Sequence, residues 1–298
     1  MSPLESIAVW VTAVVLTISG LISNGFIVTT TIIEWTKFKS LSSSELLFLS
    51  LSLSNFVVGV LLFPFSMDDF IIFSFKQSTT LKILFPVAVF AILSRFWLTA
   101  WLCVFYCIKI VNSTHSLFLW CKLRISWLIP RLIAGSLLIS FFASLGALEM
   151  YPIHCQGNAT IFRTLSQGKT LRASDFRFQL FFIIFGTCSP LLTVLLCSTL
   201  VVASLSRHIC QMTGKEHFRD FQRKAHIKAT GTVLSLLLVY LSFFAVQIWS
   251  VTLDPTYTEK LFISAVMMAY APVQATILVL SNPKLKQVLT VMVRRTKP

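Results

Sequence analysis

The chain has 298 residues, of which 56% are hydrophobic and 12% are charged, and its formal net charge at pH 7 is +14. A soluble domain of this length could not bury so much apolar surface, so the composition excludes an ordinary soluble protein. The basic excess alone would suit a nucleic-acid binder, but its placement along the chain argues against that class.

Seven apolar segments, almost free of acidic and basic side chains, fill most of the chain. Each is about 20 to 29 residues long, and an α-helix rises about 1.5 Å per residue, so each can cross a hydrocarbon core of roughly 30 Å. The sequence therefore predicts an all-α fold, a single seven-transmembrane-helix bundle over residues 1–298. In chain order, the predicted spans are 7–33, 46–66, 83–108, 125–148, 178–206, 229–253 and 261–280.

Lys and Arg are distributed unequally between the connections on the two sides of this bundle. The positive-inside rule places the richer side in the cytoplasm. We therefore expect the N-terminus outside and the C-terminus inside, in a multi-pass protein of the plasma membrane that has the lipid bilayer as a partner. Proteins that bind single-stranded nucleic acid alternate aromatic with basic residues, and the basic residues here do not follow that pattern. No nucleic-acid partner is therefore expected. The richer side has sixteen basic residues, in 34–40, 109–124, 207–228 and 284–298, and the other side has seven.

Two glycosylation sequons lie on opposite sides of the predicted membrane. Asn158 begins the sequon Asn-Ala-Thr in the longest outer loop, 149–177, whereas Asn112 begins the sequon Asn-Ser-Thr in a cytoplasmic loop. Only a sequon on the lumenal side meets the glycosylation machinery. We therefore predict an N-glycan on Asn158 and none on Asn112.

Cysteine and histidine residues show no grouping with zinc-ligand spacing, and no metal or other cofactor is expected. Cys155 is the one cysteine in an outer loop, so no intrachain disulfide is expected there.

The ionisable residues inside the spans separate three possible functions, which are receptor, transporter and intramembrane enzyme. Charge at the centre of a bilayer is costly and usually marks function. Arg95 lies deep, Glu45 and Arg131 lie near the inner ends, and all aspartates lie in loops. An intramembrane hydrolase needs a convergent catalytic pair, and an ion transporter normally has several acids or an internal repeat. The sequence therefore favours a receptor over a small-solute transporter and predicts no enzymatic activity.

Five local motifs make this interpretation more specific. The longest is at the inner end of the third span, in 97–110 (WLTAWLCVFYCIKI) and 118–125 (FLWCKLRI). In register and over nearly the whole chain, the five resemble the motifs of the type 2 bitter taste receptors, a family of seven-helix G-protein-coupled receptors. The other four motifs are 24–27 (NGFI), 204–212 (SLSRHICQM), 224–229 (KAHIKA) and 277–287 (ILVLSNPKLKQ).

The resemblance implies a receptor for small, mostly lipophilic bitter agonists that activates a heterotrimeric, gustducin-like G protein. A receptor of the same fold for another chemosensory ligand is the alternative. The chain departs from the family pattern where ligand contacts are expected. Ala88 and Ile92 replace an outer Trp and Asn of the third span, Gln274 replaces an inner His of the seventh, and Asn55 replaces an Arg of the second. The agonists of known relatives therefore cannot be transferred to this chain.

The ligand pocket is expected between the outer halves of the third, fifth, sixth and seventh spans. Ala88 and Ile92 are four residues apart and share a helix face. An apolar pocket with few polar groups suits small lipophilic ligands. Side chains at comparable depth in the other spans, and the position that the family resemblance indicates in the seventh, complete the predicted pocket. The predicted ligand-binding residues are Ala88, Ile92, Phe181, Phe185, Phe243, Gln247 and Ser264.

The inner ends of the helices are expected to receive the C-terminal helix of a G-protein α subunit, as the resemblance implies, by a helix-in-groove contact. The alternative is that the basic residues there only set the topology and bind anionic lipid head groups. The predicted contact residues are Tyr106, Lys109, Arg207, His208, His226 and Lys228.

Arg95 is predicted to belong to an intramembrane polar core. It shares a helix face with Ala88 and Ile92, and the 1.5 Å rise puts it at the depth of Asn55 on the neighbouring span. A buried guanidinium without partners is expensive. We therefore expect the amide oxygen of Asn55, together with Asn24, to accept hydrogen bonds from Arg95.

Overall fold

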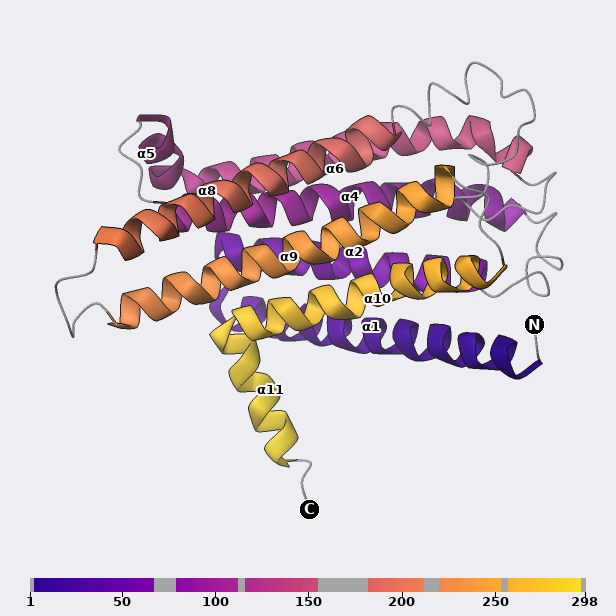
Figure 1. Cartoon of the computed structure of the whole chain (residues 1–298), viewed down its shortest axis with the longest axis horizontal. Coiled ribbons are helices and arrows are strands. Elements are labelled where there is room, and N and C mark those ends of the chain that lie inside the picture. The colour runs from indigo at the N-terminus through magenta and orange to yellow at the C-terminus, as the bar shows by residue number, and fades with distance from the viewer. Residues whose placement is uncertain are drawn as a thin grey trace.

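The computed structural model is a bundle of long helices that run alongside one another, described for residues 3–66, 79–111, 116–154, 182–211, 220–252 and 257–295 (Figure 1). Within these ranges all regular structure is helical. The elements are α1 (Pro3–Phe38), α2 (Ser43–Ser66), α4 (Thr79–Ile110), α5 (Ser116–Leu123), α6 (Ile125–His154), the π-helix η2 (Phe182–Cys188), α8 (Ser189–Gln211), α9 (Asp220–Thr252), α10 (Tyr257–Ser281) and α11 (Pro283–Arg295).

Each predicted span coincides with one long helix, the fifth with η2 and α8 together, so the prediction of an all-α bundle is confirmed. In the described part of the chain, α1, α2, α4, α6 and the η2–α8 segment contain stretches long and apolar enough to cross a membrane individually. Helix α10 makes a sixth when it is joined to α11 across a bend of 101°. The apolar part of α9 is shorter, Thr230–Val246, because the first turns of this helix carry Arg223, Lys224 and Lys228.

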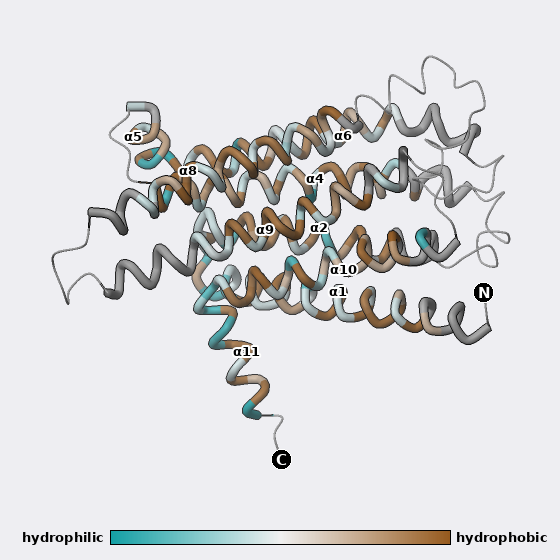
Figure 2. The backbone as a smooth tube through the Cα atoms, in the orientation of Figure 1, coloured by the Kyte–Doolittle hydropathy of each residue, from teal (hydrophilic) through white to brown (hydrophobic). Residues whose placement is uncertain are grey.

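The helix ends next to the basic connections gather at one end of the bundle (Figure 1). Helix α5 lies at this end, and α11 leaves the bundle there and runs across the direction of the long helices. Hydrophobic residues follow the long helices, whereas hydrophilic residues gather where α10 meets α11 and along parts of α11 (Figure 2). We call this the basic end, and the opposite one the far end. The arrangement keeps an apolar belt around the middle of the bundle, as a bilayer requires.

Helix α4 is the centre of the bundle. In its apolar stretch, Pro86–Ile110, 72% of the residues are buried, whereas in the apolar stretch of α1, Val11–Phe38, only 22% are buried. Two buried clusters pack on it. The larger extends toward the basic end and includes Leu98, Leu102 and Phe105, and the smaller extends toward the far end and includes Ile92 and Phe96. Helix α4 therefore contributes residues to the buried clusters toward both ends of the molecule.

Helices α1 and α10 approach each other closely at Gly20. A Cβ atom built on Gly20 would lie 3.2 Å from the Cδ atom of Pro272 and 3.6 Å from the Cβ atom of Ala271. The proline ring is rigid and cannot move aside as a flexible side chain would. Gly20 thus allows the two backbones to meet, one turn before the buried Asn24.

Replacing Gly20 with valine should destabilise the protein by about 1 to 3 kcal/mol, because the added methyl groups overpack the contact with Pro272. Gly135→Val is the matched control, since a Cβ on Gly135 meets nothing within 4 Å. Thermal unfolding of the two purified variants in detergent measures the difference. Equal melting temperatures would show that α1 and α10 can separate here without cost.

Candidate functional site

A buried polar network connects four helices in the interior of the bundle. The side-chain amide nitrogen of Asn55 on α2 donates to Oε1 of Gln274 on α10 over 2.8 Å and to Oδ1 of Asn24 on α1 over 3.3 Å. The amide nitrogen of Gln274 donates to Oγ1 of Thr99 on α4 over 3.0 Å and to the hydroxyl of Tyr270 over 3.2 Å. All five residues are buried. Gln274 is the centre of the network, because it bonds to α2 and α4 and to its own helix.

Arg95 on α4 lies among aromatic rings next to this network and is 2% exposed. Its guanidinium carbon is 4.5 Å from the ring centroid of Tyr270 on α10, and 5.2 Å from the centroids of Phe243 on α9 and Phe96 on α4. A cation–π contact is worth about 2 kcal/mol when it is desolvated. The rings also pack on one another, with 5.1 Å between the centroids of Phe243 and Tyr270. Arg95 therefore joins three helices through aromatic contacts.

The hydrogen bond expected from Arg95 to the amide oxygen of Asn55 is not formed. Among the described residues, Oδ1 of Asn55 and Nε of Arg95 both have no hydrogen-bond partner. Asn55 instead turns its amide nitrogen toward Gln274, and the charge of Arg95 is stabilised by rings of α9 and α10. The predicted trio Asn24, Asn55 and Arg95 is nevertheless buried throughout.

Four further residues of this region, Gln274, Tyr270, Phe96 and Tyr240, are not predicted from the sequence. Gln274 and Tyr270 are four residues apart and share a face of α10, which is the signal that could have identified the pair. Tyr240 on α9 contacts Phe96, with 5.3 Å between ring centroids, and its hydroxyl donates to the carbonyl of Thr187 over 3.2 Å. Aromatic residues are common in every span, and no sequence pattern distinguishes these from lipid-facing ones.

The structure brings part of the predicted ligand-binding set together. Ile92 on α4 and Phe243 on α9 belong to the same buried cluster, and Ala88 is buried two turns before Phe96 on α4. Phe185, in η2, is 49% exposed. Phe181 lies outside the described residues, and the side chains of Gln247 and Ser264 are also outside them.

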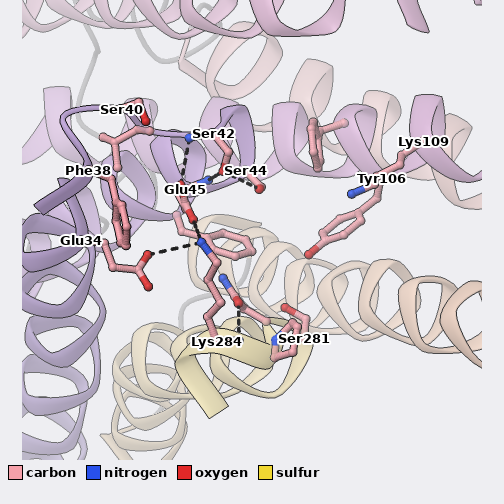
Figure 3. Close-up of a pocket in the computed structure, with 15 residues that line it drawn as sticks. Glu34, Phe38, Ser40, Ser42, Ser44, Glu45, Tyr106, Lys109, Ser281 and Lys284 are labelled. Atoms are coloured by element: carbon pink, nitrogen blue, oxygen red, sulfur yellow. Dashed lines mark hydrogen bonds and ion pairs between the residues drawn. The ribbon is translucent and has the colours of Figure 1, made fainter. Parts of the chain in front are cut away.

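A cavity of about 710 Å³ opens at the basic end of the bundle (Figure 3). It lies between α1, α2, the end of α4 and the α10–α11 junction. Tyr106 and Lys109 form part of its lining, and Tyr106 points its hydroxyl toward Ser281 at the end of α10. Apolar rings line it as well, including Phe48 and Phe105. Two of the predicted G-protein contacts therefore face a pocket of mixed apolar and polar character.

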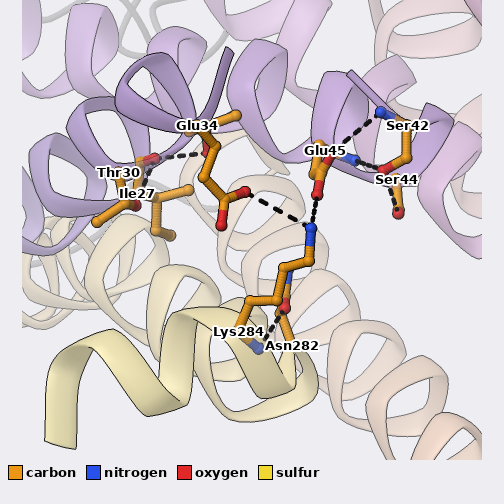
Figure 4. A network of polar contacts seen from close by, with 9 residues as sticks. Ile27, Thr30, Glu34, Ser42, Ser44, Glu45, Asn282 and Lys284 are labelled. Carbon is orange, nitrogen blue, oxygen red and sulfur yellow. Dashed lines mark hydrogen bonds and ion pairs between the residues drawn. The ribbon is translucent and has the colours of Figure 1, made fainter. Parts of the chain in front are cut away.

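Lys284 on α11 lies between two carboxylates at the edge of this cavity (Figure 4). Its ammonium group is 2.7 Å from Oε1 of Glu45 on α2 and 3.8 Å from Oε2 of Glu34 on α1. The hydrogen bond to Glu45 raises the pKa of Lys284 above its ordinary value, so this lysine stays charged. Glu45 also accepts a 2.9 Å bond from the backbone N–H of Ser42, while its own N–H donates to Oγ of Ser42 over 3.3 Å. This capping box begins α2 and orients the carboxylate toward α11.

The other predicted G-protein contacts are on helix segments whose side chains lie outside the described part of the structure. Arg207 and His208 are near the end of α8, and His226 and Lys228 are near the start of α9. Asn158, the predicted glycosylation site, also lies outside the described residues. The backbone places both pairs at the basic end, where Tyr106 and Lys109 are found (Figure 1).

Comparison with known proteins decides the family. The model of the family described as taste receptor protein (TAS2R) matches residues 1–297. The chain belongs to this family of taste receptors. Taste receptor type 2 member 40 of Gallus gallus is 33% identical over 299 residues, covering 97% of this chain and 95% of the relative. Taste receptor type 2 member 2 of Homo sapiens is 30% identical over 280 residues, covering 90% of each chain.

Taste receptor type 2 member 1 of Pan paniscus is 32% identical over 283 residues, which cover 92% of each chain. The resemblance inferred from the five motifs is thus confirmed over almost the whole length. The protein is a multi-pass membrane receptor, and the prediction that it is not an enzyme is confirmed because the family consists of taste receptors.

Replacing Gln274 with methionine should lower the stability of this taste receptor by about 1 to 3 kcal/mol. Methionine has a similar length, but it leaves the hydroxyl of Thr99 and the amide of Asn55 without their α10 partner. Thr276→Val is the control, because Thr276 is exposed and bonds to the carbonyl of Pro272 on its own helix. Unfolding temperatures of the purified variants provide the comparison, and unchanged stability of Gln274→Met would contradict a central role for this side chain.

Proposed function

We propose that this taste receptor detects small, mostly lipophilic bitter compounds at the far end of the bundle and activates a heterotrimeric, gustducin-like G protein at the basic end. The observation that carries the proposal is the course of α4. On this one helix, Ala88 and Ile92 lie toward the far end, Thr99 joins the polar network, and Tyr106 and Lys109 line the cavity. The helix thus links the two proposed sites directly.

The proposed ligand face is supported by the character of the smaller cluster. Ile92, Phe96, Tyr240, Phe243 and Tyr270 are buried there, so a ligand that enters between them would meet aromatic and aliphatic side chains. Such surfaces bind apolar bodies with little directional demand, which suits a receptor for varied lipophilic compounds. The residues come from α4, α9 and α10, so a ligand among them would contact helices that can shift relative to one another.

The proposed G-protein face is supported by the cavity and its charges. A pocket with Phe48, Phe105 and Tyr106 beside Lys109 can receive the apolar side of a helix end, and the lysine can pair with a carboxylate on the partner. Ligand binding would act on this face by changing how α9 and α10 pack on α4. Because these helices are joined by the Arg95 and Gln274 contacts, a shift in one is transmitted to the others.

The basic end is proposed to be cytoplasmic, which leaves the N-terminus outside. Anionic lipids of the inner leaflet attract Lys and Arg, and α11 carries Lys286, Arg294 and Arg295 beside exposed Leu289 and Met292. A helix of this kind, bent away from α10, suits the plane of a membrane surface.

The function is tested by calcium release in cells that express the receptor with a chimeric G protein and are given a panel of bitter compounds. At least one compound should evoke a response that vector-transfected cells lack. In such cells Lys109→Ala should lower the maximal response several-fold without changing the amount of surface receptor, because the lysine lines the cavity. Lys37→Ala, which removes an exposed lysine from the last turn of α1 and does not line the cavity, is the matched control and should leave the response unchanged.

A response only to compounds outside the bitter panel would favour another chemosensory ligand, and uptake of labelled solute without G protein would favour a transporter. Loss of surface receptor equal to the loss of signal in Lys109→Ala would assign this lysine a folding role instead.

The orientation is tested by N-glycosylation. Asn158 should carry the glycan, because it would be lumenal in the proposed topology, and Asn112 should carry none. Glycosidase treatment should therefore shift the gel mobility of the wild type and of Asn112→Gln, and leave Asn158→Gln unchanged. A shift that persists in Asn158→Gln and disappears in Asn112→Gln would invert the topology.

A further inference from the structure

Arg95 is a buried cation to which the membrane-spanning part of the chain supplies no anion. No Asp or Glu occurs in any of the seven predicted spans. The side chain is 2% exposed and lies against the rings of Phe96, Phe243 and Tyr270. Removing a charge from water is costly, and neutral rings compensate for only part of that cost. An oxyanion at Arg95 would supply the opposite charge and the hydrogen-bond acceptors that the rings do not.

The ring contacts leave hydrogen-bonding capacity on the guanidinium. A ring near the guanidinium carbon stabilises the positive charge, but it does not replace an oxygen acceptor for the N–H groups. The Nε atom of Arg95 has no hydrogen-bond partner in the described part of the structure. Guanidinium groups present their N–H donors in a planar fork that matches the two oxygens of a carboxylate. A ligand with an oxyanion therefore matches the donor that Arg95 has available.

The position of Arg95 connects it with the proposed ligand face. Ile92 and Ala88 lie about one and two helical turns away on α4, toward the far end. Ile92 and Phe243 belong to one apolar cluster, and Phe243 also contacts the guanidinium. A ligand with an oxyanion at Arg95 would therefore place its apolar body against Ile92 and Phe243.

We propose that Arg95 anchors the head group of the ligand and that this receptor takes small amphiphiles with a carboxylate on an aromatic or aliphatic body. This inference rests on the proposed ligand pocket and specifies its chemical class. The carboxylate accepts hydrogen bonds from Arg95, and the body replaces aromatic contacts within the cluster. Since the rings of Phe243 and Tyr270 belong to α9 and α10, binding at Arg95 changes how these helices pack on α4.

The test compares a carboxylate with neutral compounds of the same shape. Binding of 2-naphthoate, 2-naphthamide and methyl 2-naphthoate to the purified full-length receptor in lipid nanodiscs is measured by calorimetry. The acid should bind about tenfold more tightly than the amide and the ester. Arg95→Gln should remove this preference and leave the affinity for the amide nearly unchanged, and Arg95→Lys should retain part of it.

Arg131→Gln is the matched control. Arg131 is an exposed cation on α6 whose guanidinium carbon is 3.3 Å from the ring centroid of Trp127, outside the buried cluster. This variant should keep the preference for the acid. If Arg95→Gln does not reach the membrane, the ranking of the three compounds on the wild type and on Arg95→Lys decides the question.

Three results overturn the proposal. These are equal affinities of acid and amide for the wild type, an acid preference that survives in Arg95→Gln, and no binding of the acid at millimolar concentration. Calcium release separates this proposal from the proposed function. Tight, Arg95-dependent binding of the acid without any calcium response supports the anchor and contradicts the coupling. A calcium response to neutral compounds alone supports the receptor function and contradicts the anchor.

Discussion

The hydrogen bond between Asn55 and Gln274, 2.8 Å long, joins α2 to α10 in the buried interior of the bundle. Asn24 adds α1 to this contact, and Thr99 adds α4, so four of the long helices meet at one set of buried amides. In hydrocarbon, apolar side chains give no strong preference for a neighbouring helix over a lipid tail. Directional bonds of this kind therefore determine which faces of the helices meet, and the positions of the other sites follow from them.

Two groups of residues on α4 depend on that arrangement. On one side of Thr99, Arg95 lies among rings of α4, α9 and α10, and beyond it the smaller apolar cluster extends toward the far end. On the other side, the larger cluster packs α4 against α2, α6 and α8 down to Tyr106 and the cavity. Close-packed cores transmit displacement because they have few voids in which to absorb it. The two ends of the bundle are thus mechanically connected along α4.

At the basic end, a single carboxylate has two structural roles. Glu45 caps the first turn of α2 and also binds Lys284, so one carboxylate fixes both the start of α2 and the direction of α11. Glu34 adds a second, longer contact from α1. The three helices meet at the rim of the cavity, whose shape therefore depends on the position of α11. An ion pair with an exposed lysine contributes little to stability on its own, so its main effect is on geometry.

The amino-acid sequence alone predicts the seven helices, the unequal charge of the two ends and the family, because length, hydropathy and local motifs do not depend on how the helices pack. It also predicted the burial of Asn24, Asn55 and Arg95, since depth follows from the helical rise. Their hydrogen-bond and ring partners, by contrast, depend on how the helices pack and could not be predicted in this way. The spans are apolar on nearly every face, so periodicity does not indicate how each helix is rotated about its axis. The packing of α10 on α2 and α4 places Gln274 at Asn55, and the packing of α9 and α10 on α4 brings Phe243 and Tyr270 to Arg95.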